Sequence, residues 1–429
     1  MTHRILAFTF ACASTFAATP SPTFYKEVLP LLQNNCQGCH RPGEVAPMSF
    51  LSYESTRPWA KAIRNAVLTK KMPPWFADPH VGKFTNDRSM TKADIDTIVN
   101  WVDAGTPAGD RKDAPAPIAF VEGWQIGKPD QVFQIPTPYD VPASGTVEYT
   151  YFVLPTGFKE DTWVYAAEAR PGNNAVVHHV IAYLREPGSK WLPDAKPYLA
   201  YVPSKSTPAS ADEFLAQYAP GEPPANLKKG QAVLIKAGSD IVLQIHYTTN
   251  GKAQSDQSRV GLIFAKGPVT ERIGVLAAVN NKFAIPPGDP NYRVVASLTF
   301  AKDTKLVDIH PHMHFRGKSF SYRLIYPDGR TEDVLNVPRY DFNWQLLYDL
   351  PEGKLIPAGT KMECVAHFDN SPNNKFNPDP TATVHWGDQT WEEMMVGFFR
   401  VSFDPKMSKK ELLAPATVPP TTTSASNRN

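Results

Sequence analysis

The residues with the most specific chemistry are Cys36, Cys39 and His40, which form a Cys-Gln-Gly-Cys-His run. Two thiols at this spacing can form thioether bonds to one edge of a porphyrin, and the adjacent imidazole can then ligate the iron. The same run also fits a redox dithiol or half of a zinc site. The chain has only four cysteines, without a second close pair to complete a zinc site. The motif therefore predicts a covalently attached c-type haem.

An electron-transferring haem needs a second axial ligand, and a methionine thioether is the soft, neutral donor expected there. Met72 follows a predicted helix and precedes Pro73 and Pro74, which stiffen the loop that must hold its sulfur against iron. This loop resembles the distal-ligand loop of small class I cytochromes c. Met48 and Met90 are the alternatives, and each is otherwise expected to pack in a core.

Six of the 11 histidines fall in three β-rich segments farther along the chain: His178, His179, His246, His310, His312 and His314. Side chains at i and i+2 share one face of a strand, so His312 and His314 can converge on one ion. Adjacent side chains face opposite ways, so His178 and His179 can bind one ion only if their strand bulges or ends there. The clustering indicates metal ligation; the alternative is that these histidines pack a β core.

The choice of metal depends on whether a methionine joins one of these pairs. Imidazole suits zinc, copper, iron and nickel, whereas a thioether favours copper, particularly Cu(I). The run Trp-Glu-Glu-Met-Met ends in Met394 and Met395, and either sulfur could serve. A thioether ligand from this run would predict copper.

The region from about 124 to 403 resembles the copper type II, ascorbate-dependent monooxygenases, the family of peptidylglycine α-hydroxylating monooxygenase and dopamine β-monooxygenase. Four motifs match in the family's order: His-His at 178–179, Leu-Gln-x-His-Tyr at 243–247, His-x-His and a following glycine at 312–317, and acidic-Glu-Met at 392–394.

The resemblance implies two β-sandwiches facing each other across a wet cleft. It also implies two copper ions, one that passes electrons and one that activates O₂ beside a substrate C–H bond. Their implied ligands are His178, His179 and His246 for the first, and His312, His314 and Met394 for the second. Copper supplies the one-electron steps that let O₂ react.

The chain departs from this family in two respects. The animal enzymes are rich in disulfides, whereas this region has only Cys364, so packing alone must hold its sheets. His310 is an additional histidine, which either joins the His-x-His pair in an all-histidine site or has a structural role. We interpret His367 and His385 as structural or surface residues, and His80 as exposed.

Hydrophobic periodicity divides the chain into a helical part and two β-rich parts. Pro58 is expected to begin a helix over 59–71, and residues 91–94 form a capping box for a second helix. Strands are expected at 147–153, 240–247 and 305–309. We predict a multidomain protein. A signal peptide at 1–18 is followed by a small all-α cytochrome c domain at 22–112 and a linker at 113–123. Two all-β sandwich (jelly-roll-like) domains follow at 124–268 and 269–405, and the chain ends in a disordered tail at 406–429.

The composition and the first residues limit where the protein is expected to be located and what it is expected to bind. Lys and Arg number 44 against 42 Asp and Glu, and the net charge of +2 argues against a nucleic-acid role. Arg4 and the short apolar run after it are typical of a secretion signal, so a periplasmic or secreted protein is expected. Cys12 allows a lipid anchor, although its neighbours fit that pattern poorly. No segment approaches the roughly 20 apolar residues of a transmembrane helix.

These features together predict an exported haem- and copper-containing monooxygenase that hydroxylates a substrate C–H bond. Its electrons would come from a periplasmic donor through the fused cytochrome c, which would stand in for ascorbate. Its reactants would be O₂ and a small-molecule or peptide substrate of unknown identity. The alternatives are a copper oxidoreductase that inserts no oxygen and a haem–copper electron-transfer or copper-binding protein.

Overall fold

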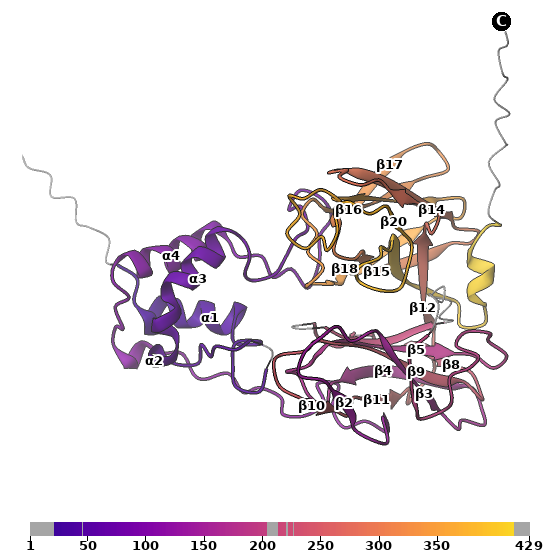
Figure 1. Ribbon diagram of the computed structural model, residues 1–429, viewed down its shortest axis with the longest axis horizontal. Coiled ribbons are helices and arrows are strands. Elements are labelled where there is room, and N and C mark those ends of the chain that lie inside the picture. The colour runs from indigo at the N-terminus through magenta and orange to yellow at the C-terminus, as the bar shows by residue number, and fades with distance from the viewer. Residues whose placement is uncertain (1–20, 45, 204–212, 220–221, 226, 416–429) are drawn as a thin grey trace, which may run out of the picture.

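The computed structural model describes residues 21–44, 46–203, 213–219, 222–225 and 227–415. The predicted signal peptide with Cys12, and residues 416–429 of the predicted tail, lie outside this part of the chain. The fold is mostly β, with a small group of helices beside the β-rich remainder (Figure 1). Among the described residues, every helix is too short or too polar to cross a membrane.

The helices of the N-terminal part surround one small apolar core. They are η1 (Phe24–Val28), α1 (Leu29–Asn35), α2 (Tyr53–Thr56), η2 (Arg57–Trp59), α3 (Ala60–Leu68), α4 (Lys92–Asp103) and η3 (Arg111–Asp113). Phe24, Leu32, Ile98 and Trp101 are fully buried in this core. Burial of such large side chains offsets the weak stability that helices this short have alone.

The helix-start signals in the sequence are partly confirmed. Thr91 Oγ1 accepts the backbone N–H of Asp94, and the Asp94 carboxylate accepts the Thr91 N–H, so the expected capping box begins α4. Pro58 lies in the 3₁₀ turn η2 and not at the start of an α-helix, and α3 begins two residues later and ends at Leu68. The predicted helix over 59–71 is therefore shorter than expected.

In the part of the β-rich region that the structure describes there are 21 strands. Those of its first half are β1 (Gln131–Gln134), β2 (Tyr139–Val141), β3 (Thr150–Pro155), β4 (Thr162–Arg170), β5 (Val177–Arg185), β6 (Ala200–Tyr201), β7 (Glu213–Tyr218), β8 (Gln231–Ile235), β9 (Asp240–Tyr247), β10 (Gln254–Asp256) and β11 (Arg259–Phe264). Those of its second half are β12 (Glu271–Val279), β13 (Ala284–Ile285), β14 (Tyr292–Thr299), β15 (Thr304–His312), β16 (Gly317–Ile325), β17 (Thr331–Val337), β18 (Tyr348–Ile356), β19 (Lys361–Phe368), β20 (Val384–His385) and β21 (Val396–Phe403).

One eight-stranded sheet, in the order β1-β11-β4-β8-β12-β21-β15-β18, runs through both β-rich halves. A five-stranded sheet (β6-β3-β9-β5-β7) packs on its first half and a four-stranded sheet (β14-β19-β16-β17) on its second, with an apolar core between the layers in each half. The halves meet through the parallel pair β8 and β12. The β layers are thus continuous at the point where the sequence predicts a boundary between two sandwiches.

Two expectations about local structure are wrong. The strand expected at 147–153 begins only at Thr150, although it continues to Pro155. The tail expected to be disordered from 406 is ordered to residue 415: η4 (Lys409–Leu412) buries Leu412 completely in the second-half core, and Leu413 pairs with Phe300. The polar composition of this tail did not indicate that Leu412 would be buried.

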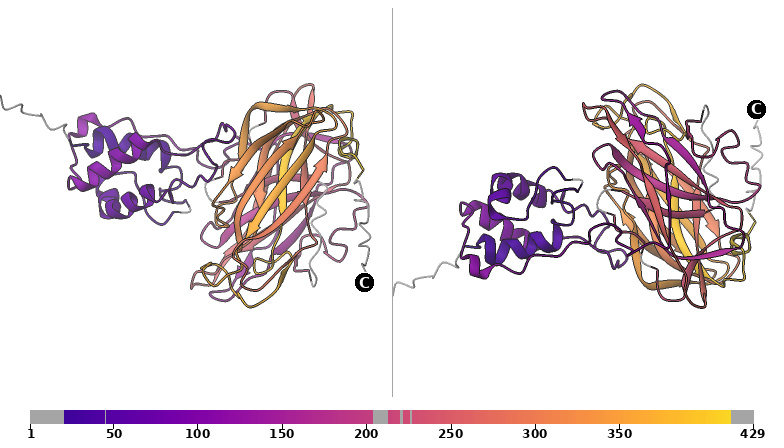
Figure 2. Two further views of the ribbon diagram at one scale, coloured as in Figure 1. Left: turned by 90° about the horizontal axis from the view of Figure 1, so that it is seen from above. Right: turned by 90° about the horizontal axis from the view of Figure 1, so that it is seen from below.

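The segment after Met72 leaves the helices and lies on the second β half. Phe76 is buried in that half's core, and Trp75 and Phe84 pack against it. The Asp78 N–H donates to the Asn336 carbonyl at 2.8 Å, and a second backbone bond follows at Thr85. Views from above and below show the helices beside the β layers and joined to them by this segment and the chain after α4 (Figure 2).

Candidate metal centre

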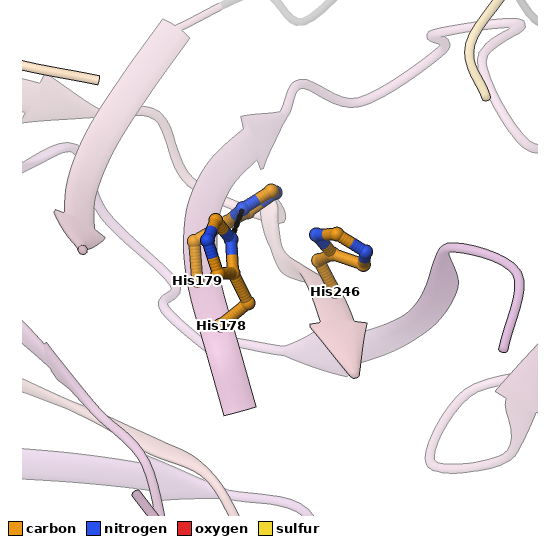
Figure 3. A group of neighbouring side chains, drawn as sticks. All are labelled: His178, His179 and His246. Atoms are coloured by element: carbon orange, nitrogen blue, oxygen red, sulfur yellow. Dashed lines mark hydrogen bonds between the residues drawn. The ribbon is translucent and has the colours of Figure 1, made fainter. Parts of the chain in front are cut away.

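Among the described residues, three histidines from two neighbouring strands form a cluster of ligand-capable groups. His178 and His179 lie on β5 and His246 on β9, and one ring nitrogen of each lies within 4.8 Å of the other two. The rings face one another, and the Nδ1 atoms of His178 and His179 are 3.2 Å apart (Figure 3). Three imidazoles gathered in this way are a donor set that suits copper and zinc. We call these residues the first histidine group.

A β-bulge turns His178 and His179 toward the same point. In the β5–β9 pairing Val177 lies opposite Tyr247 and His179 opposite His246, so His178 is the extra residue between them. A bulge lets two successive side chains share one face of the sheet. His178 and His179 can bind one ion only if their strand bulges or ends there, and β5 has this bulge.

Burial keeps the rings of the first histidine group neutral. It lowers the pKa of His178, lowers that of His179 well below the ordinary value, and lowers that of His246 to about 3. The neighbouring imidazoles lower the pKa values of His179 and His246 further, because two adjacent positive charges repel. Neutral imidazole is the form that binds metal, so these rings can bind a cation without first losing a proton.

His312 and His314 form a second pair at the end of β15. Their ring centroids are 5.2 Å apart. His312 Nδ1 donates to Gln345 Oε1 at 2.6 Å, and His314 Nδ1 donates to the Glu392 carbonyl at 3.2 Å. These bonds occupy one nitrogen of each ring and leave both Nε2 atoms for a metal, as metal-binding histidines are commonly held. His314 Nε2 is buried and has no hydrogen-bond partner among the described residues.

Glu393 fastens this pair to the loop that carries Met394. The side chain is fully buried, and its two oxygens accept the backbone N–H groups of His314 at 2.9 Å and Arg316 at 2.6 Å. Arg316 donates in turn to the Trp391 carbonyl. A carboxylate that bridges the two segments in this way fixes the separation of His314 from Met394.

Met394 and Met395 point to different surroundings. Met394 lines a cavity together with His312 and His314, whereas Met395 is fully buried in the second-half core. Met394, His312 and His314 are called the mixed group below. His310 lines the same cavity and is buried, and its Nε2 has no hydrogen-bond partner in the described part of the chain.

Both groups border one cavity of about 400 Å³ between the β layers. Its lining includes His179 of the first histidine group and all three residues of the mixed group. Most of the remaining wall is aromatic or apolar, and includes Tyr149, Tyr151, Tyr183, Trp191, Phe214, Trp386 and Phe398. Polar groups are few, which suits binding of a small, largely apolar molecule.

The Cys-Gln-Gly-Cys-His run lies just after α1 in a tight turn. The N–H groups of Cys39 and His40 donate to the Cys36 carbonyl at 3.1 and 2.9 Å. The His40 ring stacks on Phe50 with centroids 4.3 Å apart, and burial lowers the pKa of His40 and favours the neutral imidazole. Both cysteines are free thiols. These residues fit covalent haem attachment.

The methionine candidates for the haem differ in placement. Met48 and Met90 pack against the helical core. Met72 is partly buried and follows α3, at the point where the chain turns toward the β layers. Met72 as the axial ligand stays a prediction.

The remaining histidines lie apart from both groups. His80 and His385 are exposed, and His367 is partly exposed on β19, where Ser319 contacts its ring. The sequence missed Gln345 and Phe342, which lie in a loop without any motif. Phe342 stacks on His178, with centroids 6.0 Å apart, and meets His314 edge-on at the same separation.

Comparisons with known proteins add little. No family model matches the sequence, and no curated protein matches it significantly. Among solved structures, the infectious bursal disease virus VP2 subviral particle is 10% identical, with 66% of this chain and 74% of that chain covered and a TM-score of 0.19. A chain from the structure of the Gt strain of that virus is also 10% identical, over 70% of this chain and 76% of that chain, with the same TM-score. Scores this low carry no inference about function.

Proposed function

We propose that this chain is an exported haem- and copper-containing monooxygenase that hydroxylates a substrate C–H bond with O₂, and that its electrons arrive through the N-terminal c-type haem unit. The observation that carries the proposal is one cavity lined by His179, which belongs to a cluster of three imidazoles, and also by two further imidazoles and a thioether. A thioether beside imidazoles is a donor set selective for copper.

The candidate ligands would have different roles, which depend on their surroundings. His178, His179 and His246 would hold one copper, and their burial keeps the imidazoles neutral. The mixed group would hold the other copper, with Gln345 and the Glu392 carbonyl orienting its two rings. Cys36, Cys39, His40 and Met72 would hold the haem. Bound copper and haem supply one-electron chemistry that no side chain provides.

The cavity wall would bind the substrate and exclude water. Hydroxylation consumes the C–H compound, O₂, two electrons and two protons, and yields the alcohol and water. Aromatic side chains such as Tyr183, Trp191 and Phe398 offer an apolar surface to the carbon skeleton. A periplasmic electron donor would reduce the haem, and the substrate would be a small molecule or a peptide.

The test uses the full mature chain, produced with haem attachment and loaded with copper. Metal analysis is expected to find two coppers and one iron per chain. With ¹⁸O₂ and a panel of small apolar and peptide substrates, one labelled oxygen atom is expected in the product. Loss of a substrate hydrogen with no label in any product, or zinc in place of copper, would overturn the proposal.

A further inference from the structure

One short segment touches both metal-binding groups. It runs from Phe342 to Tyr348 and is called the bridge segment here. At its start the Phe342 ring lies parallel to His178 (10° between planes) and edge-on to His314, each with centroids 6.0 Å apart. His246 is 6.4 Å from the same ring. A single buried aromatic ring thus lies between the first histidine group and the mixed group.

The middle of the bridge segment is bonded directly to a predicted copper ligand. Gln345 Oε1 accepts from His312 Nδ1 at 2.6 Å. Gln345 and Leu346 are both buried, and the exposed fractions of their side chains are 8% and 4%. The contact is therefore held in place by packing and not by a mobile surface side chain.

The far end of the bridge segment meets the loop that carries Met72. Tyr348 packs against Trp75 with ring centroids 4.9 Å apart, and only two prolines separate Trp75 from Met72. Asn86 bonds the segment from the same side, and donates to the Leu347 carbonyl at 2.7 Å. Arg339, shortly before the segment, donates to the Lys70 carbonyl at 2.8 Å. The predicted haem loop is thus bonded to the second β half before Met72 and packed against it after Met72.

The rival contact between the haem motif and the β layers is weaker. Asn174, near the first histidine group, donates to the Gly43 carbonyl at 3.3 Å, and this bond is exposed to solvent. It is a long hydrogen bond, whereas the bridge segment contacts the Met72 loop at Tyr348 and both histidine groups at Gln345 and Phe342, within seven consecutive residues. Chains of packed side chains and hydrogen bonds carry coupling between distant sites.

We propose that the bridge segment is the electron conduit of this protein, entered through the Trp75–Tyr348 contact and opening onto both metal-binding groups. The inference rests on the proposed function. In each transfer the haem iron loses one electron and passes from ferrous to ferric, and one copper gains it and passes from cupric to cuprous. No bond to a side chain forms or breaks. An exported reductant restores the ferrous haem.

The experiment follows anaerobic electron transfer and not turnover. Holoprotein with cupric copper receives one electron at the haem from a photoreductant, and the loss of the ferrous haem absorption band is timed. Trp75→Leu is expected to slow this decay by about tenfold, because it removes the ring that contacts Tyr348. Trp75→Phe keeps a ring and should stay within about threefold of the parent rate.

Two control variants separate this route from its alternatives. Phe84→Leu removes a ring that packs on both Trp75 and Tyr348 while leaving the contact between those two residues, and Asn174→Ala removes the rival bond. Both are expected to transfer at the parent rate. Haem midpoint potential and copper content are measured for each variant and should be unchanged, so that misfolding is recognised.

The outcomes separate the two proposals. If Trp75→Leu decays at the parent rate, or if Asn174→Ala is the slow variant, the conduit is overturned while the proposed function stands. If ferrous haem in the parent chain decays equally with and without copper, the proposed function itself fails.

Discussion

The first histidine group and the mixed group border the same cavity but are built in opposite ways. The first takes its three rings from adjacent strands of one sheet, and a bulge supplies the only irregularity. The mixed group joins the end of β15 to a loop that follows β20, and a buried Glu393 holds the two together. One group is part of the sheet, and the other is assembled between separate segments.

This difference would hold the ligands of the two proposed copper ions in different ways. The hydrogen bonding of the first group is internal, between the Nδ1 atoms of His178 and His179. In the mixed group each imidazole has a separate partner, Gln345 or the Glu392 carbonyl, which orients its free nitrogen. Two imidazoles held in a fixed orientation, together with a soft thioether, would suit a copper ion that leaves one coordination position for O₂.

The largest expected effect comes from removing a ring of the first group. His246→Ala should weaken copper binding there by about 100-fold or more, because losing a ligand costs more than the 10–100-fold loss of an outer partner. Copper per chain, measured after dialysis, should fall from two to one. His367→Ala, on the partly exposed face of β19, is the matched control and should keep both. Two retained coppers in His246→Ala would contradict the assignment.

Removing copper should lower the stability of the whole chain. At free copper one hundred times the dissociation constant, each site stabilises the folded state by about 2.7 kcal/mol. Urea unfolding with and without a copper chelator measures this difference. In His246→Ala the effect should fall by about half, because only the mixed group remains. Identical unfolding curves with and without copper would show that neither group binds it.

A smaller effect separates the two neighbouring methionines. Met394→Leu should weaken Cu(I) binding at the mixed group by more than about tenfold, because the thioether is the ligand that favours Cu(I). X-ray absorption should lose its copper–sulfur distance. Met395→Leu keeps core volume and should cost less than about 1.5 kcal/mol of stability, with copper binding intact. If the sulfur signal persists in Met394→Leu and vanishes in Met395→Leu, the assignment is reversed.

The smallest effect concerns the partner of His312. Gln345→Leu should weaken copper binding at the mixed group by about tenfold and leave the first group unchanged, since it removes an orienting bond and no ligand. Gln244→Leu is the control, because Gln244 lines the same cavity but bonds the Tyr151 hydroxyl. Competition with a copper chelator measures both variants. Equal affinities for the two would remove Gln345 from the site.

Much of the site could be predicted because short motifs carry it. The strand at 240–247 was predicted from a run of β-favouring residues and matches β9, which carries His246. The requirement for a bulge at His178 followed from the two-residue period of a strand. By contrast Phe342 and Gln345 lie in a loop between β17 and β18 with no periodicity, so their positions follow only from the packing of the second β half.

The sequence alone determined the chemistry available: a haem-attachment run, paired imidazoles and a methionine that could join them. These are local patterns, and covalent spacing is enough to define them. Only the tertiary structure decided that Met394 and Met395 face different surroundings, that both histidine groups line one cavity, and that the chain after Met72 packs on the β layers. Such relations depend on contacts between residues far apart in the chain, which packing of the whole fold selects.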